Sequence, residues 1–323
     1  MILVTGGAGY IGSHAVRMLI ARGEKVLVFD NLSEGHEEAA SGAELVIGDL
    51  RDRGAVTALF KSHPIEIVFH FANLCRVADS MAEPELYFDV NVTGGMNLLD
   101  AMRRSGVRKM IFSSSAAVYG SPEQQPIPED APREPINPYG LTKVMFEDAL
   151  SFACRHWGMG AVSLRYFNAA GAADDGSIGE SHARESHIIP IALEAALGRR
   201  DAVRIFGTDY PTKDGSCLRE FVHVEDIAEA HLLAMKALAG KVEHGIYNIG
   251  AGVVASVKEV IETARRVTGG KIKAENAPRR TGDPVMLQAD SAKIRRELGW
   301  RPRYAALESI IETAWRWAKA PKY

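Results

Sequence analysis

A tyrosine and a lysine four residues apart are well placed for acid–base chemistry. Tyr139 and Lys143 follow Asn137 and Pro138, residue types favoured at the N-cap and in the first turn of a helix. Residues i and i+4 share one helix face, so we expect the phenol and the ammonium group to be neighbours. The ammonium favours the phenolate, whose free pKa is about 10, and makes Tyr139 a usable general base. A surface helix with an exposed lysine is the alternative, because any helix can carry this spacing.

Three serines supply a possible third partner. Ser113–Ser115 ends an apolar run at 109–115 that reads as a strand. Parallel α/β sheets place their sites beyond the carboxyl ends of strands, and a serine hydroxyl can donate to or accept from a substrate oxygen. We therefore predict a catalytic group of Ser115, Tyr139 and Lys143. If the run stood alone, three serines that end a strand and cap a turn would explain it better.

Glycines three residues apart predict a cofactor loop. Gly6, Gly9 and Gly12 lie between the first predicted strand and a helix. Their missing Cβ atoms allow a tight turn and let the backbone approach a pyrophosphate at the helix N-terminus. Asp30 ends the second strand, where its carboxylate can bind adenosine ribose hydroxyls and would repel a 2′-phosphate. These features predict NAD rather than NADP; a plain strand–helix turn is the alternative.

Short apolar runs must position these residues. The expected strands are 2–5, 25–30, 44–49, 66–72, 109–115 and 161–167. They do not alternate in polarity, which is typical of parallel strands buried on both faces. The expected helices between them are 11–22, 53–61, 86–105 and 138–157. This alternation predicts an α/β fold with a Rossmann-type, doubly wound parallel sheet.

The pattern changes after Asn168. Residues 120–136 and 170–186 read as loops. Further helices are expected at 188–197, 227–238, 257–268, 291–298 and 307–318, and strands near 204–207, 221–224 and 246–249. We predict a cofactor domain at 1–168 plus about 221–250, interleaved with a smaller C-terminal substrate domain at about 169–220 and 251–323.

Composition and net charge limit the classes of binding partner. The 323 residues are 46% hydrophobic and carry a net charge of −3, so no basic field attracts nucleic acid or anionic lipid. No apolar run approaches the roughly 18 residues of a membrane span. Cys75, Cys154 and Cys217 form no CxxC pair, and strand-like sequence begins at Ile2. We therefore expect a cytoplasmic protein that binds neither nucleic acid nor membranes.

Four segments together carry a family resemblance. The combination of 5–12, 113–119, 139–143 and 164–168 resembles the extended short-chain dehydrogenase/reductases, over residues 2 to about 317. Within that family the chain is most similar to enzymes that epimerise UDP-hexoses at C4. The more specific segments are 164–168, 205–212, 219–224 and 279–283.

The resemblance implies a reaction. It predicts reversible epimerisation of UDP-galactose and UDP-glucose through a transient 4-keto sugar, with NAD tightly bound. Tyr139 would take the proton of the sugar 4-OH while hydride moves from C4 to NAD+, and Ser115 would hold the same oxygen. A homodimer formed through two helices is usual in the resembling family.

The resemblance also implies cofactor contacts. They are Gly6, Gly9, Tyr10, Ile11, Gly12, Asp30, Asn31, Asp49, Leu50, Phe71, Ala72, Asn91, Ser113, Tyr139, Lys143 and Tyr166. Asp49 ends the third strand, where it could reach the adenine or cap a loop.

The implied contacts to the UDP-sugar lie mostly in the second half. They are Ser80, Ser115, Tyr139, Asn168, His187, Ile188, Arg204, Phe206, Arg219, Arg280, Asp283 and Leu287. Arginines can fork onto a diphosphate and an aromatic ring can lie against uracil. Leu287 would face the sugar C2 substituent; its intermediate size predicts activity on UDP-galactose and leaves N-acetylated sugars open.

Two departures bear on the alternatives. Nucleotide-sugar 4,6-dehydratases resemble this scaffold but carry an Asp-Glu pair where this chain has Ala116 and Ala117. The loop 72–80 differs from the usual family pattern at Cys75 and Arg76, which is expected to affect the nicotinamide side. UDP-N-acetylhexosamine or UDP-pentose 4-epimerases, and a non-catalytic NAD-sensing protein, remain further alternatives.

Histidines do not predict a metal centre. His182, His187 and His223 show no metal-ligand spacing that we can identify, so we expect no metal site and NAD as the only cofactor.

Overall fold

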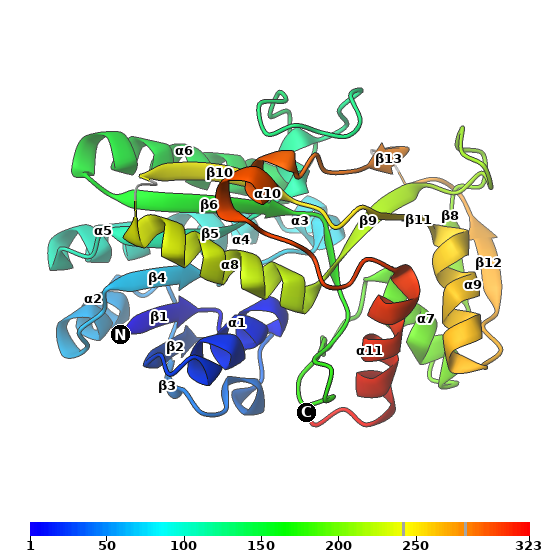
Figure 1. The fold of residues 1–323 in the computed structure, drawn as a ribbon, viewed down its shortest axis with the longest axis horizontal. Coiled ribbons are helices and arrows are strands. Elements are labelled where there is room, and N and C mark those ends of the chain that lie inside the picture. The colour runs from blue at the N-terminus through cyan, green and yellow to red at the C-terminus, as the bar shows by residue number, and fades with distance from the viewer. Residues whose placement is uncertain (241–242, 281–282) are drawn as a thin grey trace.

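The computed structural model describes residues 1–240, 243–280 and 283–323, and a seven-stranded parallel sheet forms its larger part (Figure 1). Across the sheet the strands are β10 (His244–Ile249), β6 (Gly160–Tyr166), β5 (Lys109–Ser115), β4 (Ile67–His70), β1 (Ile2–Thr5), β2 (Val26–Asp30) and β3 (Glu44–Ile47). All neighbours are parallel. The predicted parallel sheet is confirmed.

Helices cover both faces of this sheet. They are α1 (Tyr10–Ala21) and α8 (Val224–Ala239) on one face, and α2 (Arg53–Ser62), α5 (Gly94–Ser105) and α6 (Pro138–Trp157) on the other. Within β1, Ile2 and Val4 pack with the α1 side, whereas Leu3 packs with the α2 and α5 side. Strands β1, β2 and β4 are buried on both faces, which explains their mainly apolar sequences, whereas the edge strand β3 is partly exposed. The doubly wound α/β prediction is therefore confirmed.

The strand order reverses beside β1. The chain runs outward from β1 to β2 and β3, then returns to place β4 on the other side of β1. In such sheets the loops leaving two neighbouring strands diverge and leave a crevice at the carboxyl edge. The glycine loop follows β1 and Phe71 follows β4, so both border this crevice.

A smaller part lies at the carboxyl edge of the sheet (Figure 1). One of its sheets has the strands β7 (Asn168–Ala170), β9 (Leu218–His223), β11 (Val253–Ser256) and β13 (Met286–Leu287). A second sheet pairs β8 (Val203–Phe206) with β12 (Ala274–Ala277). The helices of this part are α7 (Ile188–Ala196), α9 (Val257–Thr268) and α11 (Leu307–Lys319). Helix α10 (Ala292–Leu298) returns to contact β10.

Two predicted details were wrong. We placed the strand near 221–224 with the large sheet, but β9 pairs with β7, β11 and β13; only α8 and β10 join the large part. The predicted helix 86–105 is broken into α4 (Pro84–Tyr87), a π-helical segment at Phe88–Thr93 and α5, preceded by α3 (Val77–Ala82). The π-helical segment contains buried Asn91, whose side chain holds the loop after β4.

In residues 1–240, 243–280 and 283–323, no helix is long and apolar enough to cross a membrane.

Candidate active site

The glycine loop fits tightly into the protein at two of its three glycines. A Cβ on Gly6 would lie 2.5 Å from the Ala72 nitrogen, and one on Gly12 would lie 2.1 Å from the Gly6 oxygen. A Cβ on Gly9 would meet only the Gly6 oxygen, at 3.4 Å. Gly9 is also the N-cap of α1 and forms no side-chain cap, so the helix offers its N–H groups and positive dipole end outward. The glycine-loop backbone and the N-terminus of α1 therefore fit a phosphate group.

Asp30 ties β2 to this loop. One carboxylate oxygen accepts from the Ala8 N–H at 3.0 Å, and the other accepts from the Leu32 N–H at 2.9 Å. Burial raises the pKa of Asp30, and the backbone N–H groups of Leu32 and Ala8 oppose that rise. The carboxylate is held at the carboxyl end of β2, where we predicted a ribose contact.

Asp49 has partners within the protein. Its two oxygens accept from Arg51 Nε at 3.0 Å and Nη2 at 2.8 Å, and from Asn31 Nδ2 at 2.9 Å. The Arg51 hydrogen bonds hold the pKa of Asp49 well below its usual range, against a smaller effect of burial. These hydrogen bonds fix the Asp49 carboxylate at the end of β3, and its contact with adenine stays a prediction.

The predicted acid–base pair is buried beside the serines. Asn137 caps α6 by accepting from the Gly140 N–H at 2.8 Å, as its position predicts. Lys143 is 2% exposed, and its Nζ donates to the Ser113 carbonyl at 2.8 Å and lies 5.6 Å from the centre of the Tyr139 ring. Ser115, at the end of β5, accepts from the Ala117 N–H at 3.1 Å. A snorkelling surface lysine is excluded by this burial.

Burial favours the neutral form of both groups of the pair. It raises the pKa of Tyr139 above its usual value, Cys75 adds to the rise, and the Ser115 hydroxyl opposes it. Burial also lowers the pKa of Lys143 to about 7, and the nearby Cys75 and Glu147 only partly oppose this. A positively charged ring bound above the phenol would favour the phenolate, so this environment fits an oxidised nicotinamide.

Two further tyrosines surround the pair. The Tyr166 and Ser113 hydroxyls are hydrogen-bonded to one another, and burial raises the pKa of Tyr166. The Tyr87 ring centre lies 6.5 Å from that of Tyr139, and its hydroxyl donates to the Arg76 carbonyl at 2.6 Å. Tyr166 is among the predicted cofactor contacts, whereas Tyr87 was not predicted to lie near the pair.

Other predicted cofactor residues border the crevice or support it. Tyr10 and Ile11 begin α1, and Phe71 and Ala72 follow β4. The remaining two are Leu50 and Asn91, which are both buried. The Asn91 amide donates to the Leu74 carbonyl at 3.0 Å and to the Thr142 hydroxyl at 3.1 Å. Its oxygen accepts from the Leu74 N–H at 2.8 Å. The hydrogen bonds of Asn91 point to support of the loop rather than to direct ligand contact.

The predicted nucleotide residues form pairs in the smaller part. Arg219 on β9 is ion-paired with Asp283, and the Arg280 guanidinium lies 3.8 Å from the centre of the Phe206 ring. Leu287 on β13 pairs in register with Arg219, so it lies at the same edge. Thr281 and Gly282, inside the 279–283 segment, lie outside the described residues.

The remaining substrate predictions vary in support. Arg204 and Phe206 are two residues apart on β8 and therefore share one face, where Arg204 is exposed. Asn168 donates to the Glu220 carbonyl at 2.8 Å, and Ser80 is buried in α3 and donates to the Val77 carbonyl at 2.7 Å. Because of this bond, the Ser80 hydroxyl hydrogen is already engaged within the protein. His187 is the N-cap of α7, and Ile188 is its first residue.

One unexpected bridge joins the two sides of the crevice. Arg76 contacts the Glu34 carboxylate at 2.9 and 2.5 Å and Asp79 at 2.7 Å. It links the loop after β2 to the start of α3. The sequence identified Arg76 as unusual, but it gave no signal for a partner 42 positions earlier.

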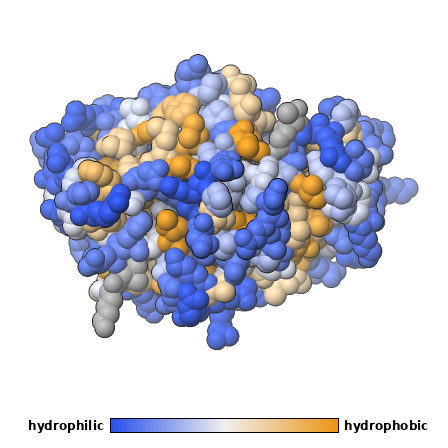
Figure 2. Space-filling model, turned by 90° about the horizontal axis from the view of Figure 1, so that it is seen from above, coloured by the Kyte–Doolittle hydropathy of each residue, from blue (hydrophilic) through white to orange (hydrophobic). Residues whose placement is uncertain are grey.

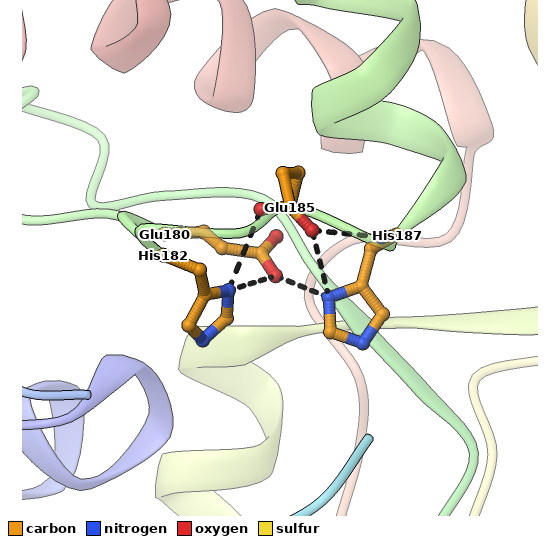
Figure 3. Close-up of side chains that lie close together, drawn as sticks. All are labelled: Glu180, His182, Glu185 and His187. Atoms are coloured by element: carbon orange, nitrogen blue, oxygen red, sulfur yellow. Dashed lines mark hydrogen bonds and ion pairs between the residues drawn. The ribbon is translucent and has the colours of Figure 1, made fainter. Parts of the chain in front are cut away.

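A second feature was also missed. Glu180, His182, Glu185 and His187 converge in the loop between β7 and α7 (Figure 3). The order Glu-x-His-x-x-Glu-x-His was the available signal. His223, the third histidine that we considered, lies elsewhere: it contacts the Thr313 hydroxyl at 2.9 Å and stacks on Tyr304.

A Rossmann-type sheet with a glycine loop and a buried Tyr–Lys pair beside a serine at a strand end defines an extended short-chain dehydrogenase/reductase. The sequence profile described as "NAD dependent epimerase/dehydratase family" matches residues 2–250, and the chain belongs to that family.

Three relatives illustrate the similarity. UDP-glucose 4-epimerase of Halalkalibacterium halodurans is 50% identical, and the match covers 98% of this chain and 95% of that protein. The crystal structure of UDP-glucose 4-epimerase from Brucella ovis in complex with NAD is 41% identical with a TM-score of 0.94, over 97% of both chains. The epimerase from Bifidobacterium longum, in complex with NAD+ and UDP, is 34% identical with a TM-score of 0.94, over 99% of this chain and 98% of that one.

Proposed function

We propose that this chain is a UDP-glucose 4-epimerase that interconverts UDP-galactose and UDP-glucose with a retained NAD. The observation that carries the proposal is the buried Tyr139–Lys143 pair beside Ser115, at the carboxyl edge that also carries the glycine loop. Relatives of near-complete coverage bear the same name. Ala116 and Ala117 follow Ser115 in a short 3₁₀ helix and cannot transfer a proton, which disfavours a dehydratase.

The large-sheet part would hold NAD. The Gly9 backbone and the α1 N-terminus suit its pyrophosphate, and Asp30 suits a ribose hydroxyl. When bound, NAD supplies the acceptor that takes hydride from the sugar C4 and gives it back.

The protein residues would move the proton. Tyr139, as phenolate, accepts the proton of the sugar 4-OH, and Ser115 holds the same oxygen. Lys143 supports the phenolate through its charge, while its hydrogen bond to the Ser113 carbonyl fixes its position. After the 4-keto sugar turns over, Tyr139 returns the proton to the sugar oxygen. Because the hydride would return to C4 as well, the net redox change is zero.

The smaller part would anchor UDP. Arg219 and Arg280 can bind the diphosphate, Phe206 can lie against uracil and Asp283 can accept from ribose hydroxyls. An anchored UDP leaves the hexose free to turn, which epimerisation requires.

Purified protein without added cofactor tests the function directly. We would supply UDP-galactose and follow it by proton NMR. A rise of UDP-glucose to a steady ratio is expected and shows that NAD is retained. Conversion only after NAD+ is added would mean weak retention. No conversion in either case would contradict the proposal, and UDP-N-acetylgalactosamine in a parallel tube tests the N-acetylated alternative.

We also propose a cytoplasmic homodimer formed through α5 and α6. Large hydrophobic side chains on these helices are exposed: Met96 by 42%, Leu141 by 40%, Met145 by 41% and Phe152 by 49%. Figure 2, which views the molecule from above, shows hydrophobic patches within a mainly hydrophilic surface. Light scattering after size-exclusion chromatography should give twice the chain mass, and Phe152→Glu should shift the mass toward one chain. A monomeric parent protein would contradict this.

A further inference from the structure

Four side chains in the loop before α7 aim their polar atoms at one another. His182 Nδ1 lies 3.3 Å from Glu180 Oε1 and 3.4 Å from Glu185 Oε2. His187 Nδ1 lies 2.5 Å from Glu180 Oε1 and 3.3 Å from Glu185 Oε1. Figure 3 shows both imidazoles facing the two carboxylates between them. One ligand atom from each residue can be chosen so that all four lie within 4.8 Å of one another.

The carboxylates are buried and need positive charge nearby. Their side chains are 6% exposed at Glu180 and 5% exposed at Glu185. Among the described residues, no lysine or arginine nitrogen lies within 4 Å of either carboxylate; the ion-pair partners are His182 and His187. Two buried carboxylates without compensation would be costly. Either both imidazoles are protonated, or a divalent cation provides the charge and the imidazoles are neutral.

The distances fit a transition metal. Zinc binds histidine nitrogen at about 2.0–2.1 Å and carboxylate oxygen at about 2.0–2.2 Å, so neighbouring ligands of a tetrahedral ion lie about 3.3 Å apart. Three of the four nitrogen–oxygen distances are 3.3 or 3.4 Å, two of them to different oxygens of Glu185. The fourth, from His187 Nδ1 to Glu180 Oε1, is 2.5 Å and would lengthen when a metal replaces the shared proton. Imidazole nitrogens select zinc and related metals over magnesium and calcium, which prefer oxygen ligands.

We infer that Glu180, His182, Glu185 and His187 form a structural zinc-type site, contrary to our expectation from the sequence. Four protein ligands leave no open position, so the site would not perform catalysis. The inference goes beyond the proposed epimerase function; it shares His187 with the predicted substrate contacts, but zinc binding can be measured without turnover.

The site would fix the loop between the two candidate binding regions. The Tyr10 ring centre lies 6.4 Å from that of His182, and the Tyr10 hydroxyl donates to the Gly171 carbonyl at 2.7 Å. Tyr10 begins the helix of the glycine loop, whereas His187 and Ile188 begin α7 on the substrate side. A metal bound here would join the start of the loop to its end.

Zinc binding to the whole protein tests the inference. Protein stripped with a chelator would be titrated with Zn²⁺ against a coloured competitor, and Co²⁺ would be added separately as a spectroscopic probe. We expect one Zn²⁺ per chain and the visible absorption typical of four-coordinate Co²⁺. His182→Gln should weaken zinc binding at least roughly tenfold, because even outer-shell changes cost about 10–100-fold. His156→Gln, which removes an exposed histidine on α6, should bind zinc like the parent.

Thermal unfolding with and without zinc keeps the test valid for variants that fold poorly. Zinc should raise the Tm of the stripped parent and of His156→Gln, but not that of Glu185→Gln, since only a site present in the folded state stabilises it. The inference is overturned if the stripped parent binds no stoichiometric zinc, or if His182→Gln and Glu185→Gln bind zinc as tightly as the parent. In that case the four residues are a protonated ion-pair cluster.

Discussion

The two candidate binding regions hold their polar groups in different ways. At the edge of the large sheet, Lys143 and Asp30 are fixed by buried hydrogen bonds to backbone groups. In the smaller part, Arg280 lies over the Phe206 ring, and Arg219 pairs with the Asp283 side chain besides donating to the backbone carbonyl of its neighbour Leu218. Backbone contacts set a geometry before any ligand binds, whereas side-chain pairs can exchange partners with a ligand. Changes in the first region should therefore lower kcat, and changes in the second should raise KM.

The largest effect is expected for Tyr139→Phe. It removes the only atom of this side chain that can take the proton, so kcat should fall by roughly 10²–10⁴-fold. Calorimetric titration with UDP should give an affinity close to that of the parent, because the UDP contacts lie in the other region. Near-normal turnover in this variant would contradict the assignment of Tyr139.

A smaller effect, on binding, is expected for Arg280→Ala. Hydrogen bonds to charged groups contribute about 1.5–3 kcal/mol, so KM for UDP-galactose should rise by about 10- to 150-fold with little change in kcat. Arg279→Ala is the matched control, because the neighbouring arginine is paired with exposed Asp209 and lies over Tyr210. Equal effects of the two substitutions, or a loss of kcat alone in Arg280→Ala, would contradict the claim that the smaller part acts on KM and the large-sheet part on kcat.

The buried lysine should be visible in the pH dependence of stability. The folded-state pKa of Lys143 is lowered from 10.5 to about 7 by burial, so between these values the unfolded chain binds more protons. This group therefore makes the free energy of unfolding rise from pH 7 to pH 9. Lys143→Met, of similar shape, should show a smaller rise in urea unfolding, and Lys25→Met, at an exposed site, should match the parent. Identical slopes for the parent and Lys143→Met would mean that the folded-state pKa is not lowered.

The smallest effect is expected at the bridge across the crevice. Arg76→Ala breaks the contacts with Glu34 and Asp79, which are partly exposed. Partly exposed ion pairs contribute about 0–1 kcal/mol, so release of NAD should accelerate by no more than about fivefold. Cofactor fluorescence after dilution measures that rate, with Arg104→Ala as a control that breaks an exposed pair elsewhere. Slower release from Arg76→Ala would contradict a bridge that retains the cofactor.

Local signals predicted much of the fold. Asn137 and Pro138 mark the start of α6, and the helix spans the predicted residues 138–157. Uniformly apolar runs predicted strands buried on both faces, and all six strands expected in the first half are present. The loop at 170–186 was also foreseen.

Long-range pairings could not be predicted. β9 and β10 both end in buried residues, and only its neighbours decide that β9 joins the smaller sheet. Arg76 and Glu34 are 42 positions apart, and neither sequence segment indicates that the other is its partner. In the candidate site, the types of the reacting residues were readable, but the burial that lowers the pKa of Lys143 depends on tertiary packing.

The fate of the C4 hydrogen tests whether this protein epimerises its substrate by hydride transfer to a retained cofactor. UDP-galactose deuterated at C4 would be converted in ordinary water by the protein without added cofactor, and the UDP-glucose formed would be analysed by mass spectrometry and NMR. Deuterium is expected to remain at C4, because the hydride moves to a retained cofactor and returns to the same carbon. Loss of the deuterium to water would contradict this mechanism.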